Sequence, residues 1–214
     1  MSSSNSIREF GDRLQALRYV DGADEGFLVE QAGPIRIQAT FVERIQRTEA
    51  VIDPFGREEK FELVEYRKSE FSISEGPTGF EIKDAGRGSS RLISKLLEAV
   101  NFDFTISPIA VDPLVWAAKF QEHADRRGLI DKVQIGSIRI GQGAVAQLLV
   151  KGTVDVAAAA TKFVGEFAYE IERVQLRLAA KQGSIVFLAT GAVSITSYIE
   201  KDWLGPIRSS LATF

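Results

Sequence analysis

Apolar residues recur at helical spacing near the start of the chain, and the spacing then changes to two. The apolar positions of residues 5–19 fall three or four apart, which predicts a short amphipathic helix. From residue 33 onward apolar and polar residues alternate, which is typical of half-buried strands. Turns rich in Gly and Pro at 53–56 and 75–79 separate further alternating segments. Residues 25–83 therefore predict an antiparallel meander of about four to six strands.

The middle of the chain combines helix starts with an apolar strand. A pair of serines is a natural N-cap for a helix over 89–100. An apolar strand is expected over 102–110. The Asp-Pro pair that follows predicts a second helix over 112–127, because Asp caps the helix and Pro suits its first turn.

The last third of the chain contains the longest periodic segment. Residues 133–140 and 144–152 predict two strands joined by a glycine turn, and 184–195 predicts another apolar strand. Between them, apolar positions over 155–182 are separated by steps of three and four, which predicts one long amphipathic helix. Residues 173–180 also alternate, so a strand there is the competing interpretation.

These elements together predict an α+β fold, with an antiparallel β-meander, several helices and the long helix at 155–182. We expect a single compact domain over residues 1–214, with pseudo-repeat halves at 25–127 and 128–214. Residues 70–110 and 132–195 both run in the order strand, strand, helix, strand. This ββαβ order fits either an internal duplication or a chance recurrence of common elements.

The composition removes several kinds of chemistry. The 214 residues include no Cys and one His, His123, which excludes disulfides, thiol nucleophiles and zinc sites built from Cys or several His. Carboxylates remain as the metal ligands. The net charge of −3 argues against a basic nucleic-acid-binding domain. A polar N-terminus and the absence of an apolar run of about 20 residues predict a soluble, cytoplasmic protein without a membrane partner.

One arrangement of carboxylates is a candidate for catalysis. Glu81-Ile82-Lys83 is an acidic-x-Lys sequence on an expected strand, and Asp53 lies at the end of another. The arrangement resembles the PD-(D/E)xK nucleases, in which a carboxylate binds Mg²⁺ and a lysine positions or activates water. The resemblance implies that Asp53 and Glu81 hold Mg²⁺, with Glu9 as a third carboxylate, and that Lys83 is catalytic. The alternative is an edge strand with alternating charges.

The glycine-rich loop before the 89–100 helix is a candidate anion site. Flexible glycines, backbone N–H groups at a helix start, hydroxyls and arginines are the groups that bind phosphate. The candidate residues are Arg87, Gly88, Ser89, Ser90 and Arg91. The loop has neither the Walker A nor the dinucleotide-binding spacing, so the alternative is an ordinary capped helix start.

The sparse catalytic groups favour a non-catalytic binding or assembly protein. We expect a homo-oligomer or a partner protein, with no cofactor, and with an interface in the apolar last third of the chain. The candidate interface residues are Phe163, Phe167, Ile171 and Trp203. A Mg²⁺-dependent nuclease is the alternative function, and a phosphate- or nucleotide-sensing module is the second alternative.

Overall fold

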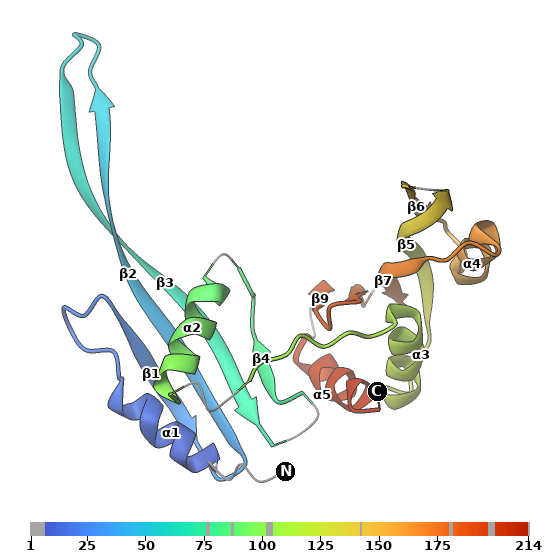
Figure 1. Ribbon diagram of the computed structural model, residues 1–214, viewed down its shortest axis with the longest axis horizontal. Coiled ribbons are helices and arrows are strands. Elements are labelled where there is room, and N and C mark those ends of the chain that lie inside the picture. The colour runs from blue at the N-terminus through green and yellow to red at the C-terminus, as the bar shows by residue number, and fades with distance from the viewer. Residues whose placement is uncertain are drawn as a thin grey trace. The chain divides into compact units, whose positions relative to one another are not determined.

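The chain divides into two compact units, Met1–Ile106 and Ser107–Phe214 (Figure 1). The computed structural model describes residues 7–75, 78–86, 88–101, 105–141, 143–179, 182–196 and 200–213. Each unit has its own antiparallel sheet and its own hydrophobic core. This arrangement confirms the predicted α+β class with an antiparallel meander. The sequence predicts one domain with halves at 25–127 and 128–214, and the two compact units of the structure meet between residues 106 and 107.

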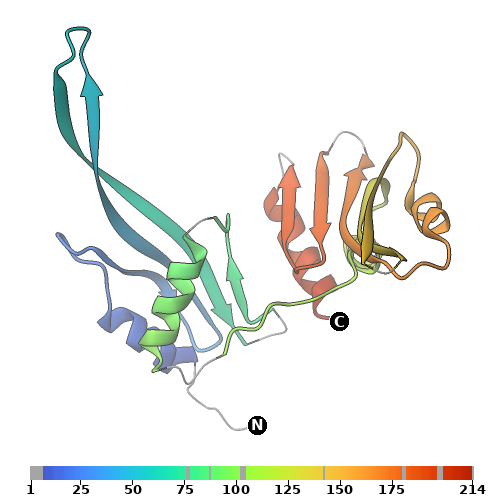
Figure 2. The same cartoon turned by 45° about the horizontal axis from the view of Figure 1, so that its top comes forward.

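The first unit is a four-stranded sheet with two helices. Its sheet has the strand order β1-β2-β3-β4, and all neighbouring strands are antiparallel. Its elements are α1 (Ile7–Ala16), β1 (Glu25–Ala32), β2 (Arg36–Ile52), β3 (Glu58–Ser74), β4 (Phe80–Ile82) and α2 (Ser89–Ala99). Both helices lie on one face of the sheet (Figure 2).

The core of the first unit is built from the apolar faces that the strand and helix periods of its sequence create. Alternate residues of β2 and β3, among them Phe41 and Phe71, point to the face that the helices cover. Leu14 of α1 and Leu96 of α2 are fully buried against that face. The Phe27 ring of β1 lies 5.2 Å from the Phe41 ring and 6.0 Å from the Phe71 ring. The predicted amphipathic helices and alternating strands thus enclose one aromatic core.

The strands β2 and β3 extend well beyond the rest of the sheet (Figure 1). β1 pairs with β2 only as far as Glu43, and β4 pairs with β3 only over 71–73. Beyond Glu43, in the strand pairing of the described residues, each of the two long strands is paired with the other alone, from Arg44 opposite Tyr66 to Ile52 opposite Glu58. We call residues 44–66 the arm. Every residue of the arm from 46 to 66 is exposed, except the half-buried turn residue 53.

The second unit is a five-stranded antiparallel sheet with three helices. Its strand order is β6-β5-β7-β8-β9. Its elements are α3 (Pro113–His123), β5 (Gly128–Gly141), β6 (Ala144–Lys151), α4 (Ala157–Val164), β7 (Glu170–Leu178), β8 (Ser184–Leu188), β9 (Val193–Thr196) and α5 (Glu200–Leu211). The predicted cap of the helix at 112 is confirmed, since Asp112 accepts hydrogen bonds from the backbone N–H of Leu114 and Val115.

The predicted long helix over 155–182 is wrong. α4 ends at Val164, and Gly165 adopts a φ of 58° that breaks the helix. The segment 170–178 is strand β7, paired with β5 on one side and β8 on the other. The competing interpretation of a strand at 173–180 is therefore correct as far as residue 178.

The predicted ββαβ repeat is present in one of the two segments. In the second unit, β5, β6, α4 and β7 follow that order. In the first unit, β3, β4 and α2 follow it, but residues 105–110 form no strand. Residues 102–104 of the predicted strand lie outside the described part of the chain. The described structure therefore shows no second complete ββαβ unit.

Candidate functional site

Asp53 occupies the turn at the tip of the arm. Its Oδ1 accepts hydrogen bonds from the backbone N–H groups of Phe55 and Arg57, both at 2.8 Å. Its own N–H donates to the carbonyl of Arg57 at 2.9 Å. An aspartate that binds the backbone in this way stabilises a tight turn. The carboxylate proposed as a metal ligand therefore has a structural contact in the arm.

Glu81 and Lys83 lie near the opposite end of the sheet. Glu81 of β4 is opposite Ser72 of β3, which in turn is opposite Gln38 of β2. The stretch of β2 from Gln38 to Ile52, next to Asp53, spans about 45 Å at about 3.3 Å per residue. The structure does not bring Asp53 and Glu81 to one site.

The remaining groups of the nuclease candidate also have partners within the first unit. The Lys83 ammonium lies 3.1 Å from the Glu70 carboxylate, and both side chains are exposed. Glu9 accepts a hydrogen bond from Arg13 at 3.2 Å. Among the described residues, no group of three or more Asp, Glu or His side chains is placed to hold a metal ion. The groups of the nuclease candidate thus each have contacts of their own in the first unit.

The glycine-rich loop before α2 is used for packing. Arg87 lies outside the described residues, and Ser90 is exposed. The Ser89 hydroxyl donates to the carbonyl of Gly86 at 2.7 Å and does not cap a helix N–H. Gly88 is buried, and a Cβ there would lie 2.7 Å from the Arg67 side chain. A close approach between α2 and β3 therefore explains the glycine at this position.

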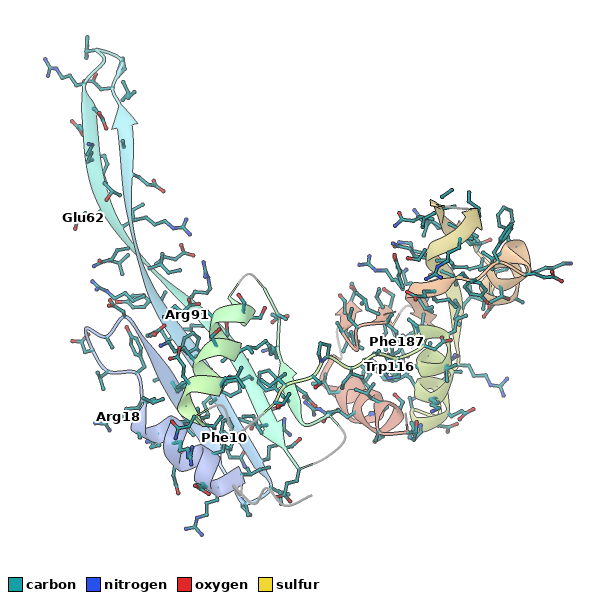
Figure 3. All side chains as sticks on the ribbon, viewed as in Figure 1. Phe10, Arg18, Glu62, Arg91, Trp116 and Phe187 are labelled. Carbon is teal, nitrogen blue, oxygen red and sulfur yellow. The ribbon has the colours of Figure 1, made fainter. Side chains whose placement is uncertain are left out.

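Arg91 is paired with a carboxylate of its own chain. Its Nε and one terminal nitrogen each donate to Glu25 at 2.9 Å, and the Lys95 ammonium lies 2.8 Å from the same carboxylate. Burial raises the pKa of Glu25, but the hydrogen bonds from Lys95 and Arg91 outweigh it and hold the pKa below its ordinary value. Glu25 is therefore ionised at neutral pH. It fills the role that the sequence had suggested for a phosphate, and Figure 3 shows Arg91 on α2.

The four predicted interface residues fall into two groups in the second unit. Trp203 is buried in the core with its ring 6.1 Å from Phe120, and Ile171 packs against the same core. Phe163 on α4 is 76% exposed, and Phe167 just after α4 is 52% exposed. The two exposed phenylalanines are thus the members of the set that lie on the surface of this unit.

The arm carries an apolar surface that none of the local sequence patterns indicates. Its exposed large apolar residues are Val51, Ile52, Phe55, Phe61, Leu63, Val64 and Tyr66. Directly opposite residues of an antiparallel pair point to the same face, so Val51, Phe61 and Leu63 share one face of the arm. Val64 and Tyr66 share the other, and Phe55 lies at the tip. Both faces of the arm are therefore partly apolar.

Charged side chains alternate with these apolar residues along the arm (Figure 3). Arg47 and Glu65 form an ion pair at 3.3 Å, and Lys60 lies 3.5 Å from Glu58. All four side chains are at least half exposed. The arm therefore presents apolar patches bordered by charges, which is the composition of many protein-binding surfaces.

The chain matches no protein-family model and no curated protein. Within the described residues, no helix is both long enough and apolar enough to cross a membrane.

Proposed function

We propose that this chain is a non-catalytic assembly protein that binds a protein partner through the arm. The observation that carries the proposal is a projecting two-stranded ribbon with seven exposed large apolar side chains on its faces and tip. Clusters of exposed apolar side chains mark interaction surfaces in soluble proteins. An isolated two-stranded hairpin is marginally stable in water, so a partner would also stabilise the arm.

The contacts of the charged candidates support a binding role over the alternatives. Asp53 is engaged in the turn of the arm, and Arg91 is neutralised by Glu25. A Mg²⁺-dependent nuclease needs carboxylates that converge, and a phosphate sensor needs cations that are available to an anion. Phe163 and Phe167 are proposed as a second, smaller contact surface, since both are exposed on the second unit.

Photo-crosslinking tests this proposal. A photoreactive phenylalanine analogue is introduced in place of Phe61 on the arm, and in a control chain in place of Ile35, which is 65% exposed in the same unit but outside the arm. Irradiation in the cells of origin is expected to give a discrete protein adduct from the arm position and none from the control. The adduct contains either a second copy of the chain or a different protein, identified by mass spectrometry. Equal labelling at both positions, or no adduct from Phe61, would contradict the proposal.

A further inference from the structure

We infer that the partner of the arm is a second copy of this chain, paired through the outer edge of β3 about a twofold axis at Leu63. The inference rests on the proposed function of the arm and specifies its partner. Two arms joined in this way form one four-stranded antiparallel sheet that spans both copies. A twofold-symmetric contact of this kind closes on itself and gives a dimer.

Among the described residues, no strand pairs with the outer edge of β3 over residues 58–69. β4 covers β3 only at 71–73, and the carbonyl of Glu70 accepts a hydrogen bond from the Lys83 N–H at 2.9 Å. Neighbouring residues of a strand direct their backbone groups to opposite edges, so the Glu70 carbonyl assigns the even-numbered residues to the outer edge. The register of β2 with β3 contains no bulge, so this alternation holds along the whole arm. The outward-facing residues are Glu58, Lys60, Glu62, Val64, Tyr66 and Lys68.

The length of this edge selects one register for self-pairing. When a strand pairs antiparallel with its own twofold-related copy, the axis passes through one residue. A residue a given number of positions before the axis then lies opposite the residue that follows the axis by the same number in the second copy. All six outward-facing residues find outward-facing partners only when the axis passes through Leu63. The opposite pairs are then Glu58 with Lys68, Lys60 with Tyr66, and Glu62 with Val64 of the second copy. An unpaired strand edge thus becomes fully hydrogen-bonded.

The neighbouring registers are worse in both hydrogen bonding and charge. An axis at Val64 places Lys60 opposite Lys68, and it places Glu58 opposite Glu70, whose carbonyl already has a partner. An axis at Glu62 places that glutamate opposite its own copy. Like charges directly opposite each other destabilise a sheet. The Leu63 register, which makes the most backbone hydrogen bonds, is therefore also the register that avoids these contacts between like charges.

The Leu63 register also aligns opposite charges. Glu58 faces Lys68 on one face of the sheet, Glu59 faces Arg67 on the other, and symmetry repeats each pair. Arg67 lies 3.6 Å from Glu43 of its own chain, so it would be shared between two carboxylates. Leu63 lies opposite its own copy at the axis. This exposed apolar side chain is therefore covered by the same side chain of the second copy.

The outer edge of β2 is less suited to the same pairing. The Arg44 N–H already donates to the carbonyl of Asp24 at 2.6 Å, so the free run of outward-facing residues begins at Gln46 and ends at Ile52. Self-pairing over that whole run places the axis at Glu49 and brings two copies of this glutamate together. The edge of β3 is therefore the one that fits a second copy.

Cysteine trapping tests the position of the axis, because the chain has no cysteine of its own. The backbone groups of Leu63 point toward β2, so the two copies of this residue form a non-hydrogen-bonded pair with Cα atoms about 4.5 Å apart. This distance lies in the range that a disulfide requires. The two copies of Phe61, on the same face, are offset along the sheet and lie about 14 Å apart. Phe61→Cys is therefore a matched control for Leu63→Cys.

The full-length chain is expected to sediment as a dimer, at twice the 23.5 kDa of one chain. Leu63→Cys is expected to form a reducible covalent dimer at least about tenfold faster than Phe61→Cys. Glu58→Lys and Lys68→Glu are each expected to raise the dimer dissociation constant by about tenfold or more, and the double variant is expected to restore it. Equal trapping rates, no restoration in the double variant, or particles larger than a dimer would overturn the inference.

A failure of self-pairing can be distinguished from a failure of the proposed binding function. A chain that stays monomeric at about 100 µM, well above the dissociation constants of stable dimers, would overturn self-pairing. If its Phe61 position still crosslinked a different protein, the arm would remain a binding surface for that protein and the proposed function would stand. If no adduct formed at all, both would be contradicted.

Discussion

Trp116→Ala is expected to lower the free energy of unfolding of the second unit by about 3–5 kcal/mol. Trp116 is 1% exposed, and its ring lies 5.2 Å from the Phe187 ring. Its Nε1 donates a hydrogen bond to the buried Ser210 hydroxyl at 3.0 Å. The substitution leaves a large cavity between α3, α5 and β8 and removes one partner of a buried polar group, so the two costs add.

Urea unfolding of the full-length chain, followed by circular dichroism, measures this loss. Val115→Ala is the matched control, because Val115 precedes Trp116 in the same helix and is 42% exposed. Its effect is expected to stay within about 0.5 kcal/mol, as for most surface substitutions. A loss below about 1 kcal/mol for Trp116→Ala would show that the tryptophan is not the centre of this core.

Phe41→Ala and Phe61→Ala are expected to have very different effects on the first unit. Both residues lie on the same face of the β2–β3 hairpin. Phe41 is 1% exposed beneath the helices, whereas Phe61 on the arm is 47% exposed. Loss of Phe41 is expected to cost about 3–5 kcal/mol, because it opens a cavity beside Phe27 and Phe71. Loss of Phe61 is expected to cost about 1 kcal/mol or less.

The comparison is made by urea unfolding at low protein concentration, where association contributes least to the measured stability. The pair is informative because the two substitutions remove the same side chain from the same hairpin. An equal cost for both would mean that the arm belongs to the folded core, and the arm would then not be a free binding surface.

Local patterns were sufficient to predict the helices and the antiparallel meander of the first unit, although the strand expected over 102–110 is absent at residues 105–110. The apolar residues of β2 fit only the two-residue period of a strand, and those of α1 fit only the three- to four-residue spacing of a helix. The sequence alone therefore indicates whether each segment is a strand or a helix. The segment 170–178 satisfies both periods, because Val174 and Leu178 are four apart while Val174, Leu176 and Leu178 alternate. Pairing with β5 and β8 decides between them. Those partners are distant in sequence, and a local pattern does not contain them.

The candidate sites depend on such distant contacts as well. Arg91 was predicted to bind an anion, and its partner Glu25 lies 66 residues earlier in the chain. The local sequence does not distinguish Phe41 from Phe61, since each shares its strand face with an apolar residue two positions away. The difference arises because β1 stops pairing at Glu43 and the helices cover only the base of the hairpin. The exposed arm is therefore a property of the tertiary structure.

Removal of the arm is the most direct test of its role in assembly. Residues 46–64 are replaced by Asn-Gly, which joins the paired residues Ile45 and Glu65 through a two-residue hairpin turn. No buried core residue lies in the deleted segment, so the circular dichroism spectrum is expected to retain the signals of both units. Size-exclusion chromatography in extract of the cells of origin then compares the two chains. We predict that the full chain elutes in a particle heavier than one 23.5 kDa chain and that the truncated chain elutes as a monomer. If the full chain and the truncated chain eluted with the same number of subunits per particle, the result would contradict a role of the arm in assembly.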